Sequence, residues 1–216
     1  MDKREFAKKE RFDFDDLWEL IKLLRSPEGC PWDREQTHRS IRNNFVEEAY
    51  EVCEGIDQKN DTILCEELGD MLFQVLFHTS IASDEKRFEP SDVIGGICKK
   101  MIYRHPHVFA DEAIKKDQIQ DSWDAIKKKE KGERTLSDTL SRVSTALPAL
   151  KRAEKYIEKG APHAEFDEKD PLLCKGEALF SIVRDCLEEE LDPEQALNAY
   201  LGAVLEKCKK NEGQSL

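Results

Sequence analysis

Residues 61–82 read DTILCEELGDMLFQVLFHTSIA, and as a helix they are apolar on nearly every side. Such a helix is typical of the centre of a bundle, where neighbouring helices cover all of its faces. The same helix carries one polar stripe at spacings of three and four residues, formed by Glu67, Asp70, Gln74 and His78. Burying that stripe against an apolar core is very costly unless it meets a partner of opposite charge. We therefore expect a central helix whose polar stripe faces such a partner.

Amphipathic periodicity predicts further helices on both sides of this segment. They are expected over residues 13–25, 35–55, 90–104, 123–131, 147–157 and 172–210. Asp13 is available as a cap for the first, and SPEGCPW at 26–32, with two prolines and a glycine, is expected to be a turn or loop. Glycine and proline make up 18 of 216 residues and charged residues 37%, which favours long solvated helices over a sheet. The predicted fold class is all-α.

Composition and charge limit the partners of the chain. The formal net charge is -12, so a long polyanion such as duplex DNA would be repelled, whereas small anions carried by metal ions remain possible. The seven cysteines form no C-x-x-C pair, which argues against a disulfide framework or a zinc ribbon. The N-terminus lacks the apolar region of a signal peptide, and no stretch reaches the roughly 18 apolar residues that span a bilayer. We expect a soluble cytoplasmic protein, with neither a nucleic-acid polymer nor a membrane as its partner.

Two acidic motifs carry the clearest chemical signal. They are E-E-x-x-E at residues 47–51 and E-E-x-x-D at residues 66–70, on the second and third expected helices. If the two helices are antiparallel neighbours, four carboxylates converge: Glu48, Glu51, Glu67 and Asp70. Four such anions need a cation, and oxygen-only ligands select hard ions such as Mg²⁺ and Mn²⁺. The alternative is a solvated acidic face, or ion pairs with lysines of another helix.

Basic and aromatic residues supply further candidates. Lys100 and Arg104 lie at i and i+4 on the apolar side of their helix, where they are placed to clamp phosphate oxygens. The alternative is that they extend to solvent or pair with the excess carboxylates. Trp32 and Trp123 lie in polar contexts, where an aromatic face suits either a nucleobase or packing. The remaining candidates for a zinc site fit no zinc pattern: Cys30, His38, His105 and His107.

One internal repeat is visible. The sequence GDMLF at 69–73 is echoed by GEALF at 176–180, and FEP at 88–90 by LDP at 191–193. The order of both matches is preserved, and the second copy is shorter by four residues between them. We therefore favour a degenerate repeat.

Four blocks of sequence occur in order: CPWDREQTH (30–38), EEAYEV (47–52), EELGDMLFQVLFH (66–78) and KKMIYRHPHVF (99–109). They are similar to the MazG-type nucleoside triphosphate pyrophosphohydrolases, and the resemblance covers roughly residues 14–130. It implies an all-α fold of the four-helix-bundle type, usually a tight homodimer. It also implies that Mg²⁺, with Mn²⁺ as a substitute, is used to split nucleoside triphosphates (NTPs) into the monophosphate (NMP) and pyrophosphate.

The resemblance also implies roles for individual residues. Metal ligands are expected at Glu48, Glu51, Glu67 and Asp70, and phosphate contacts at Lys100 and Arg104. Glu47 is implied as a ligand of a second ion or as the group that activates water. Trp123 and Lys127 lie where the family carries a tryptophan and a lysine near the nucleotide.

The C-terminal part departs from the family pattern. Residues 147–156 resemble the linker helix of two-domain members, and residues 173–208 resemble only the latter half of their second catalytic domain. Glu177 stands at the position of Asp70, but Cys174 stands at that of Glu67, and no E-E-x-x-E motif precedes them. We therefore predict a catalytic domain over 1–132 and a C-terminal segment over 133–216 without a complete metal site.

Three hypotheses about function follow. The first is an Mg²⁺-dependent pyrophosphohydrolase in which a metal-activated water attacks the α-phosphorus and Glu47 or Glu51 takes the proton. The second is a nucleotide-binding module that has lost turnover and senses an NTP or an alarmone. The third, a ferritin-like di-iron protein, is disfavoured because it requires an E-x-x-H pair from each of two helices. Base and sugar preference, the number of ions and the choice between dimer and tetramer are left open.

Overall fold

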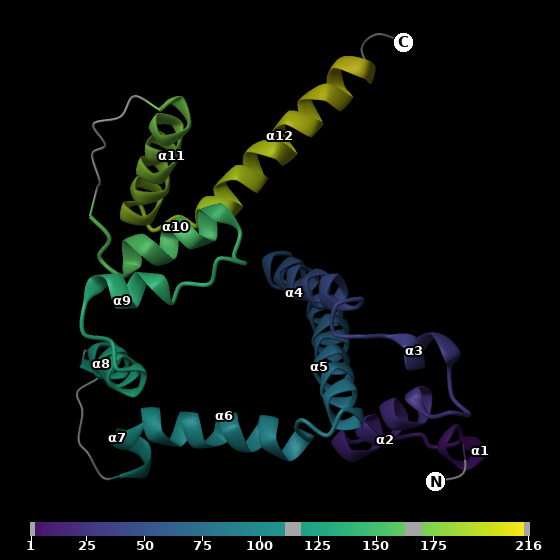
Figure 1. The fold of residues 1–216 in the computed structure, drawn as a ribbon. Coiled ribbons are helices and arrows are strands. Elements are labelled where there is room, and N and C mark those ends of the chain that lie inside the picture. Colours follow the sequence, from purple (N-terminus) through teal and green to yellow (C-terminus); the bar gives the residue numbers. More distant parts are fainter. Residues whose placement is uncertain (1–2, 111–117, 163–169, 214–216) are drawn as a thin grey trace. The chain divides into compact units, whose positions relative to one another are not determined.

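The computed structural model describes residues 3–110, 118–162 and 170–213, and every regular element in these ranges is a helix (Figure 1). The chain is all-α, as the sequence predicts. In order, the helices are α1 (Lys3–Phe6), α2 (Phe14–Arg25), α3 (Pro31–Glu35), α4 (Arg42–Asp57), α5 (Asp61–Asp84), α6 (Pro90–Arg104), α7 (Pro106–Phe109), α8 (Ile119–Lys131), α9 (Leu136–Ser141), α10 (Ala149–Glu158), α11 (Pro171–Glu188) and α12 (Pro193–Gly213). Across the described ranges, none of these helices combines the length and the apolar character needed to cross a bilayer.

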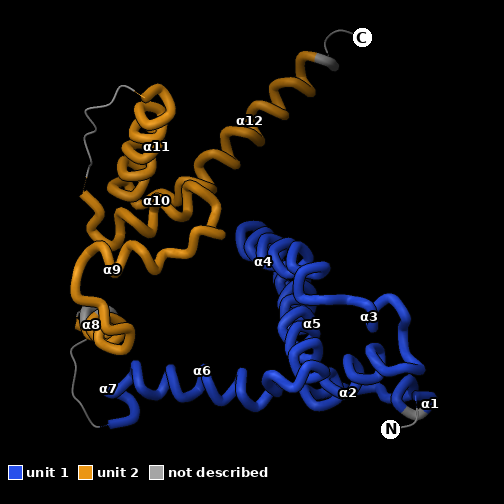
Figure 2. The backbone as a smooth tube through the Cα atoms, viewed as in Figure 1, with its two compact units in different colours: residues 1–112 blue, residues 113–216 orange. Residues whose placement is uncertain are grey.

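The chain forms two compact units, residues 1–112 and residues 113–216 (Figure 2). The first contains both acidic motifs, and the second contains the echo of the repeat. These units are defined by contacts and not by catalysis. The division into a catalytic domain over 1–132 and a segment over 133–216 therefore stays a prediction.

Helix α2 begins where the sequence predicts. The side chain of Asp13 accepts a hydrogen bond from the backbone N–H of Asp16 at 3.0 Å, and the side chain of Asp16 accepts one from the N–H of Asp13 at 2.9 Å. This reciprocal capping satisfies two of the N–H groups that every helix start leaves open. The Lys9 ammonium is the main cause that lowers the pKa of the Asp16 carboxyl.

The second helix departs from the prediction of a single element over 35–55. Helix α3 begins at Pro31, so part of the predicted loop is helical, and it ends at Glu35, where the predicted helix was expected to begin. Between α3 and α4, Ser40 bonds the side chain of Gln36 at 2.7 Å and exchanges side-chain-to-backbone bonds with Thr37. Local bonds of this kind compete with the helical ladder. The main helix therefore starts only at Arg42 and runs to Asp57.

Helices α4 and α5 form a close antiparallel hairpin. The turn between them places Lys59 at φ 52°, and Asn60 then caps α5 by accepting bonds from the N–H groups of Thr62 and Ile63. Gly55 is buried against α5, where an added Cβ would lie 2.9 Å from the backbone nitrogen of Leu64. Only glycine permits this approach, which sets the spacing of the two helices near the acidic motifs.

The core of this unit lies along the C-terminal half of α5. The buried cluster consists of Ile21, Ile41, Leu76, Phe77 and Ile81. The N-terminal half of the same helix instead exposes Leu68 and Leu72. In a single chain, the prediction of a central helix over 61–82 therefore holds only for the C-terminal half of that segment.

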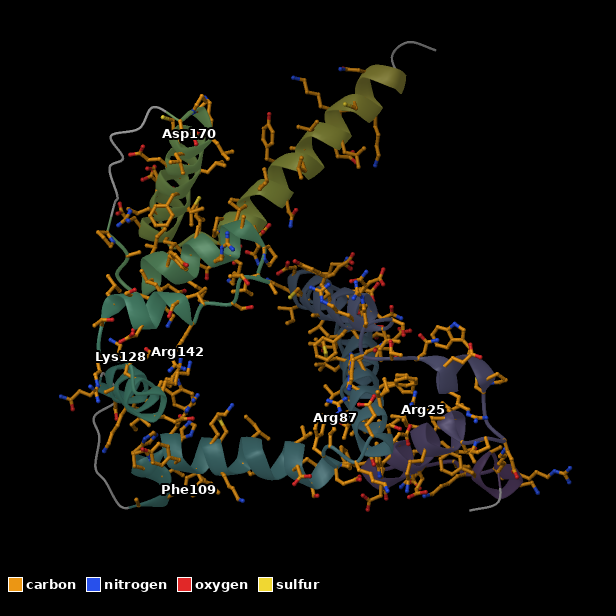
Figure 3. All side chains as sticks on the ribbon, viewed as in Figure 1. Arg25, Arg87, Phe109, Lys128, Arg142 and Asp170 are labelled. Carbon is orange, nitrogen blue, oxygen red and sulfur yellow. The ribbon has the colours of Figure 1, made fainter. Side chains whose placement is uncertain are left out.

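Arg25 joins three helices around this core (Figure 3). Its guanidinium forms an ion pair with Asp84 of α5 at 2.7 Å and donates to the carbonyl of Asp33 in α3, also at 2.7 Å. It also lies over the ring of Phe77, 5.2 Å from the ring centroid. These contacts tie the ends of α2, α3 and α5 together.

The second unit contains α8 to α12. Helix α8 ends at Gly132, which takes the left-handed conformation with φ 65°. Helix α9 was not predicted, and the predicted helical region 172–210 is divided between α11 and α12, with Glu190 in the turn at φ 58°. Val183 of α11 is almost fully buried within this unit.

Candidate metal centre

The α4–α5 hairpin brings three carboxylates of the two acidic motifs together. One oxygen of each lies within 4.8 Å of the others, in the set Glu48, Glu67 and Asp70. Glu48 comes from α4, and the other two come from one face of α5, as spacing by three residues predicts. Glu48 and Glu67 are half-buried, and Asp70 is exposed.

The surroundings of this cluster disfavour its negative charge. Burial is the largest cause that raises the pKa of Glu48, and its neighbours Glu51 and Asp70 add to the rise. Gln74 acts in the opposite direction, because its Nε2 donates to Oε1 of Glu48 at 3.4 Å. Burial likewise raises the pKa of Glu67, followed by repulsion from neighbouring carboxylates. A bound cation would relieve this repulsion.

Glu51 and Glu47 occupy different places relative to the cluster. Glu51 is exposed and is outside the three residues that meet within 4.8 Å, yet its charge contributes to the raised pKa of both Glu48 and Glu67. It therefore lies at the edge of the cluster. Glu47 is exposed, and the structure gives it no contact with the cluster among the described residues.

The structure does not bring the predicted phosphate clamp to this cluster within one chain. Glu67 precedes the end of α5 by 17 residues, which is about 25 Å because a helix rises about 1.5 Å per residue. Helix α6 leads away from that far end of α5 (Figure 1). Lys100 is exposed there and makes no ion pair with the described residues, whereas Arg104 is buried. Their role in binding phosphate stays a prediction.

Trp123 and Lys127 belong to α8 in the second unit, and both are half-buried. Their placement beside the nucleotide, which the resemblance implies, therefore also stays a prediction. The structure also places Lys127 at one cavity of this unit together with other lysines, which was not predicted.

A histidine pair beside the core was not predicted. Nδ1 of His38 lies 2.8 Å from Nδ1 of His78, and the two rings are stacked with their centroids 5.1 Å apart. Arg87 donates to Nε2 of His38. Because a guanidinium only donates, His38 carries its proton on Nδ1 and donates it to His78. Burial is the main cause that lowers the pKa of His78. The pair fixes the turn after α3 against α5.

Taken together, the first unit is an all-α scaffold whose closest helix pair presents an oxygen-only carboxylate cluster suited to a divalent cation. The family model described as the MazG nucleotide pyrophosphohydrolase domain matches residues 36–109, which include α4, α5 and α6.

Comparison with whole chains extends this match. The chain is 38% identical over 222 residues to the "nucleoside triphosphate pyrophosphohydrolase/pyrophosphatase MazG" of Thermotoga maritima, covering 92% of this chain and 85% of the relative. The chain belongs to the MazG family. It is also 40% identical over 155 residues to the nucleoside triphosphate pyrophosphohydrolase of Escherichia coli K12, covering 71% of this chain and 59% of that protein. A crystal structure of a MazG-related protein from Thermotoga maritima is 27% identical, covers 53% of this chain and 98% of that one, and has a TM-score of 0.46.

Proposed function

We propose that this chain is a metal-dependent nucleoside triphosphate pyrophosphohydrolase, which converts an NTP and water into NMP and pyrophosphate. The observation that carries the proposal is the meeting of Glu48, Glu67 and Asp70 within 4.8 Å on the α4–α5 hairpin. The names of the Thermotoga and Escherichia relatives support the same activity.

The donor set fits a hard divalent cation. All three side chains offer oxygen, and burial and mutual repulsion disfavour the charge of Glu48 and Glu67 in the absence of a cation. We infer Mg²⁺, with Mn²⁺ as a substitute, held by Glu48, Glu67 and Asp70, with Glu51 completing the set. Bound there, the ion would lower the pKa of water and offset the charge of the phosphates.

Other residues of the chain would orient a ligand, accept the proton of the attacking water and bind the substrate. Gln74 holds the Glu48 carboxylate through its hydrogen bond, which orients one ligand. Glu51, or Glu47 beside it, accepts the proton of the attacking water. A bond forms between the water oxygen and the α-phosphorus, and the bond from that phosphorus to the bridging oxygen breaks, which releases pyrophosphate. Lys100, Arg104 and Lys127 are proposed to hold the phosphates, and Trp123 to contact the base.

We also propose a homodimer, or a dimer of dimers. The first unit exposes large apolar side chains on three helices, namely Val46, Tyr50, Ile56, Leu68, Leu72, Val93, Ile94, Ile97 and Ile102. A surface of this kind is typical of an interface. A second α4–α5 hairpin packed on the first would complete a four-helix bundle, which one chain does not close. Sedimentation equilibrium tests this proposal, and a monomer at micromolar concentration would contradict it.

One active site per chain follows from the same reasoning. Among the described residues, the Glu48, Glu67 and Asp70 group is the one place where three metal-ligating side chains meet. In α11, Cys174 is exposed and Glu177 is half-buried, and no acidic motif precedes them. We propose that residues 133–216 are a structural remnant of a second domain and that residues 1–132 carry the activity.

The test is turnover of the eight common NTPs and dNTPs with Mg²⁺ or Mn²⁺, with the products identified. We expect metal-dependent release of NMP and pyrophosphate that disappears in Glu67→Ala and persists in Glu188→Ala, a matched exposed glutamate at the end of α11. Tight NTP binding without turnover would instead favour the sensing module. Release of inorganic phosphate alone would contradict cleavage at the α-phosphorus.

A further inference from the structure

One region of this acidic chain has the opposite charge. Residues 127–159 contain ten lysines and arginines against five aspartates and glutamates, whereas the whole chain carries -12. The basic residues of this region lie on α8 and α10 and around α9, all within the second unit. Separation of charge on this scale marks a place where an anion is attracted rather than repelled.

The structure gathers part of this charge around a cavity of about 410 Å³. Its lining consists of Lys127, Lys128, Lys131, Glu133, Thr139, Lys155, Glu158 and Lys159. Five of these eight residues are lysines, three from α8, one from the last turn of α10 and Lys159 directly after α10. The cavity volume is within the range of about 300–1,000 Å³ that small-ligand sites occupy.

Interactions beneath the lysines hold the wall of the cavity in place. The side chain of Glu133, only 7% exposed, accepts a hydrogen bond from the Thr139 hydroxyl at 2.9 Å and pairs with Arg142 at 3.5 Å. Nη2 of Arg142 also donates to the carbonyl of Lys131 at 2.6 Å, at the end of α8. These bonds join the end of α8 to α9, so the wall is a built structure rather than a chance grouping of surface side chains.

Internal pairing leaves the cavity positively charged. Arg142 balances the charge of Glu133, and Lys155 pairs with Glu158 at 2.7 Å. Both carboxylates of the lining are therefore already neutralised. The other lysines include Lys128, Lys131 and Lys159, which make no ion pair with the described residues. Their ammonium groups repel one another, and an anion between them would remove that repulsion.

We propose that this lysine pocket, defined by its eight lining residues, binds a compact oligophosphate anion. Several ammonium groups around one small cavity match an anion that carries several charges on linked phosphates, whereas a nucleic-acid polymer requires an extended basic track. The anion is either a free inorganic oligophosphate or the phosphate chain of a nucleotide. The proposal does not depend on the proposed hydrolysis. Lys127 stays unchanged in the test, because it is also proposed to contact the substrate.

The experiment measures binding of inorganic tripolyphosphate to the full chain by isothermal titration calorimetry in metal-free, low-salt buffer. Divalent ions are removed with a chelating resin, so that no phosphate can bind the carboxylates through a metal. The test variant is Lys131→Ala/Lys159→Ala. Its matched control is Lys207→Ala/Lys210→Ala, which removes the same charge from exposed positions of α12.

We expect one tripolyphosphate per chain, affinity at least about tenfold weaker in the test variant, and unchanged affinity in the control. A non-hydrolysable ATP analogue in the same buffer distinguishes the two sources. Tighter binding of the analogue, lost in the test variant, identifies a nucleotide, and equal or weaker binding identifies the free oligophosphate. The proposal is overturned if wild-type protein binds no tripolyphosphate, if both double variants bind like wild type, or if sulfate at equal ionic strength displaces it equally well.

Discussion

Helices α5 and α11 share a sequence motif but have different partners. Each carries the G-x-x-L-F motif, and each packs against the helix that precedes it in the described chain. On α5, that neighbour is α4, which sets Glu48 against Glu67 and Asp70. On α11 the neighbour is α10, where the buried carboxylate of Glu154 is already paired with Lys151 at 2.8 Å.

The comparison indicates that the proposed metal site depends on a pair of helices rather than on a motif. The hydrogen bond to Glu154 is the main cause that raises the pKa of Lys151, so the charge of Glu154 is balanced within α10. Among the described residues, no lysine or arginine pairs with the cluster on α4 and α5, and burial and repulsion raise the pKa of Glu48 and of Glu67. We therefore expect an external cation at the α4–α5 pair and not at the α10–α11 pair.

The largest expected effect comes from making α5 resemble α11. Glu67→Cys gives α5 the residue that α11 carries at the matched position, and it removes one ligand. We expect NTP hydrolysis to fall by about a thousandfold with Mg²⁺, comparable to the loss of one essential electrostatic group in an active site. The reciprocal change, Cys174→Glu, is expected to give no new activity, because among the described residues no carboxylates converge at α10 and α11. Initial rates measured with both variants test this, and retained activity in Glu67→Cys contradicts the assigned site.

A smaller effect is expected on the free energy of unfolding, where alanine substitutions should act in opposite directions in the two helix pairs. Gly55→Ala places a Cβ against the backbone of Leu64, so α4 must move away from α5, and we expect a loss of about 1–3 kcal/mol in unfolding free energy. Gly176→Ala meets nothing within 4 Å on α11 and removes a flexible residue from a helix interior, so we expect a gain of about 0.5–1 kcal/mol. Urea unfolding monitored by circular dichroism measures both. If the two variants shift in the same direction, the close α4–α5 approach is wrong.

The sequence predicts contacts between residues that are close along the chain better than contacts between residues that are far apart. Spacing by three residues on one helix fixes a shared face, so Glu67 and Asp70 could be placed together without a structure. The meeting with Glu48 needed only the further assumption that two consecutive helices are antiparallel. The contact between His38 and His78 spans 40 residues and two turns, and no local pattern signals it. The lysine pocket escaped prediction for the same reason, because residues that are far apart in the sequence, on α8 and at the end of α10, line one cavity.

The late start of α4 was missed for a different, local reason. Periodicity over 35–55 is continuous in the sequence, but the side chains of Thr37 and Ser40 bond the backbone of the turn, and the helix starts only at Arg42. Apolar spacing does not register that competition. The exposed N-terminal half of α5 shows the converse limit, since the sequence pattern predicts full burial and one chain supplies only part of the cover.

The smallest expected effect is a change in melting temperature in Glu48→Gln, and its direction depends on whether metal is present. Because burial and repulsion raise the pKa of Glu48 above its ordinary 4.5, the metal-free folded state binds a proton there more readily than the unfolded state does. That contribution to stability is fully present below the ordinary value and is lost as pH rises through the raised pKa. Glu48→Gln removes the titrating group, so the variant does not lose this stability as the pH rises. In metal-free buffer we expect the variant to melt slightly above wild type near neutral pH, with the difference disappearing in acid.

Saturating Mg²⁺ is expected to reverse the order of melting temperatures at neutral pH. Wild type gains about 2.7 kcal/mol when the ion is present at about 100 times its dissociation constant, whereas Glu48→Gln lacks one ligand and gains less. Thermal melts between about pH 4 and about pH 8, with and without Mg²⁺, test the metal-free prediction and the prediction with Mg²⁺. The matched control is Glu188→Gln on α11, which should melt like wild type under all of these conditions. If Glu48→Gln melts below wild type in metal-free neutral buffer, the negative charge of the cluster is balanced by groups of the protein itself, as that of Glu154 is by Lys151. The α4–α5 and α10–α11 pairs would then not differ in their need for a cation.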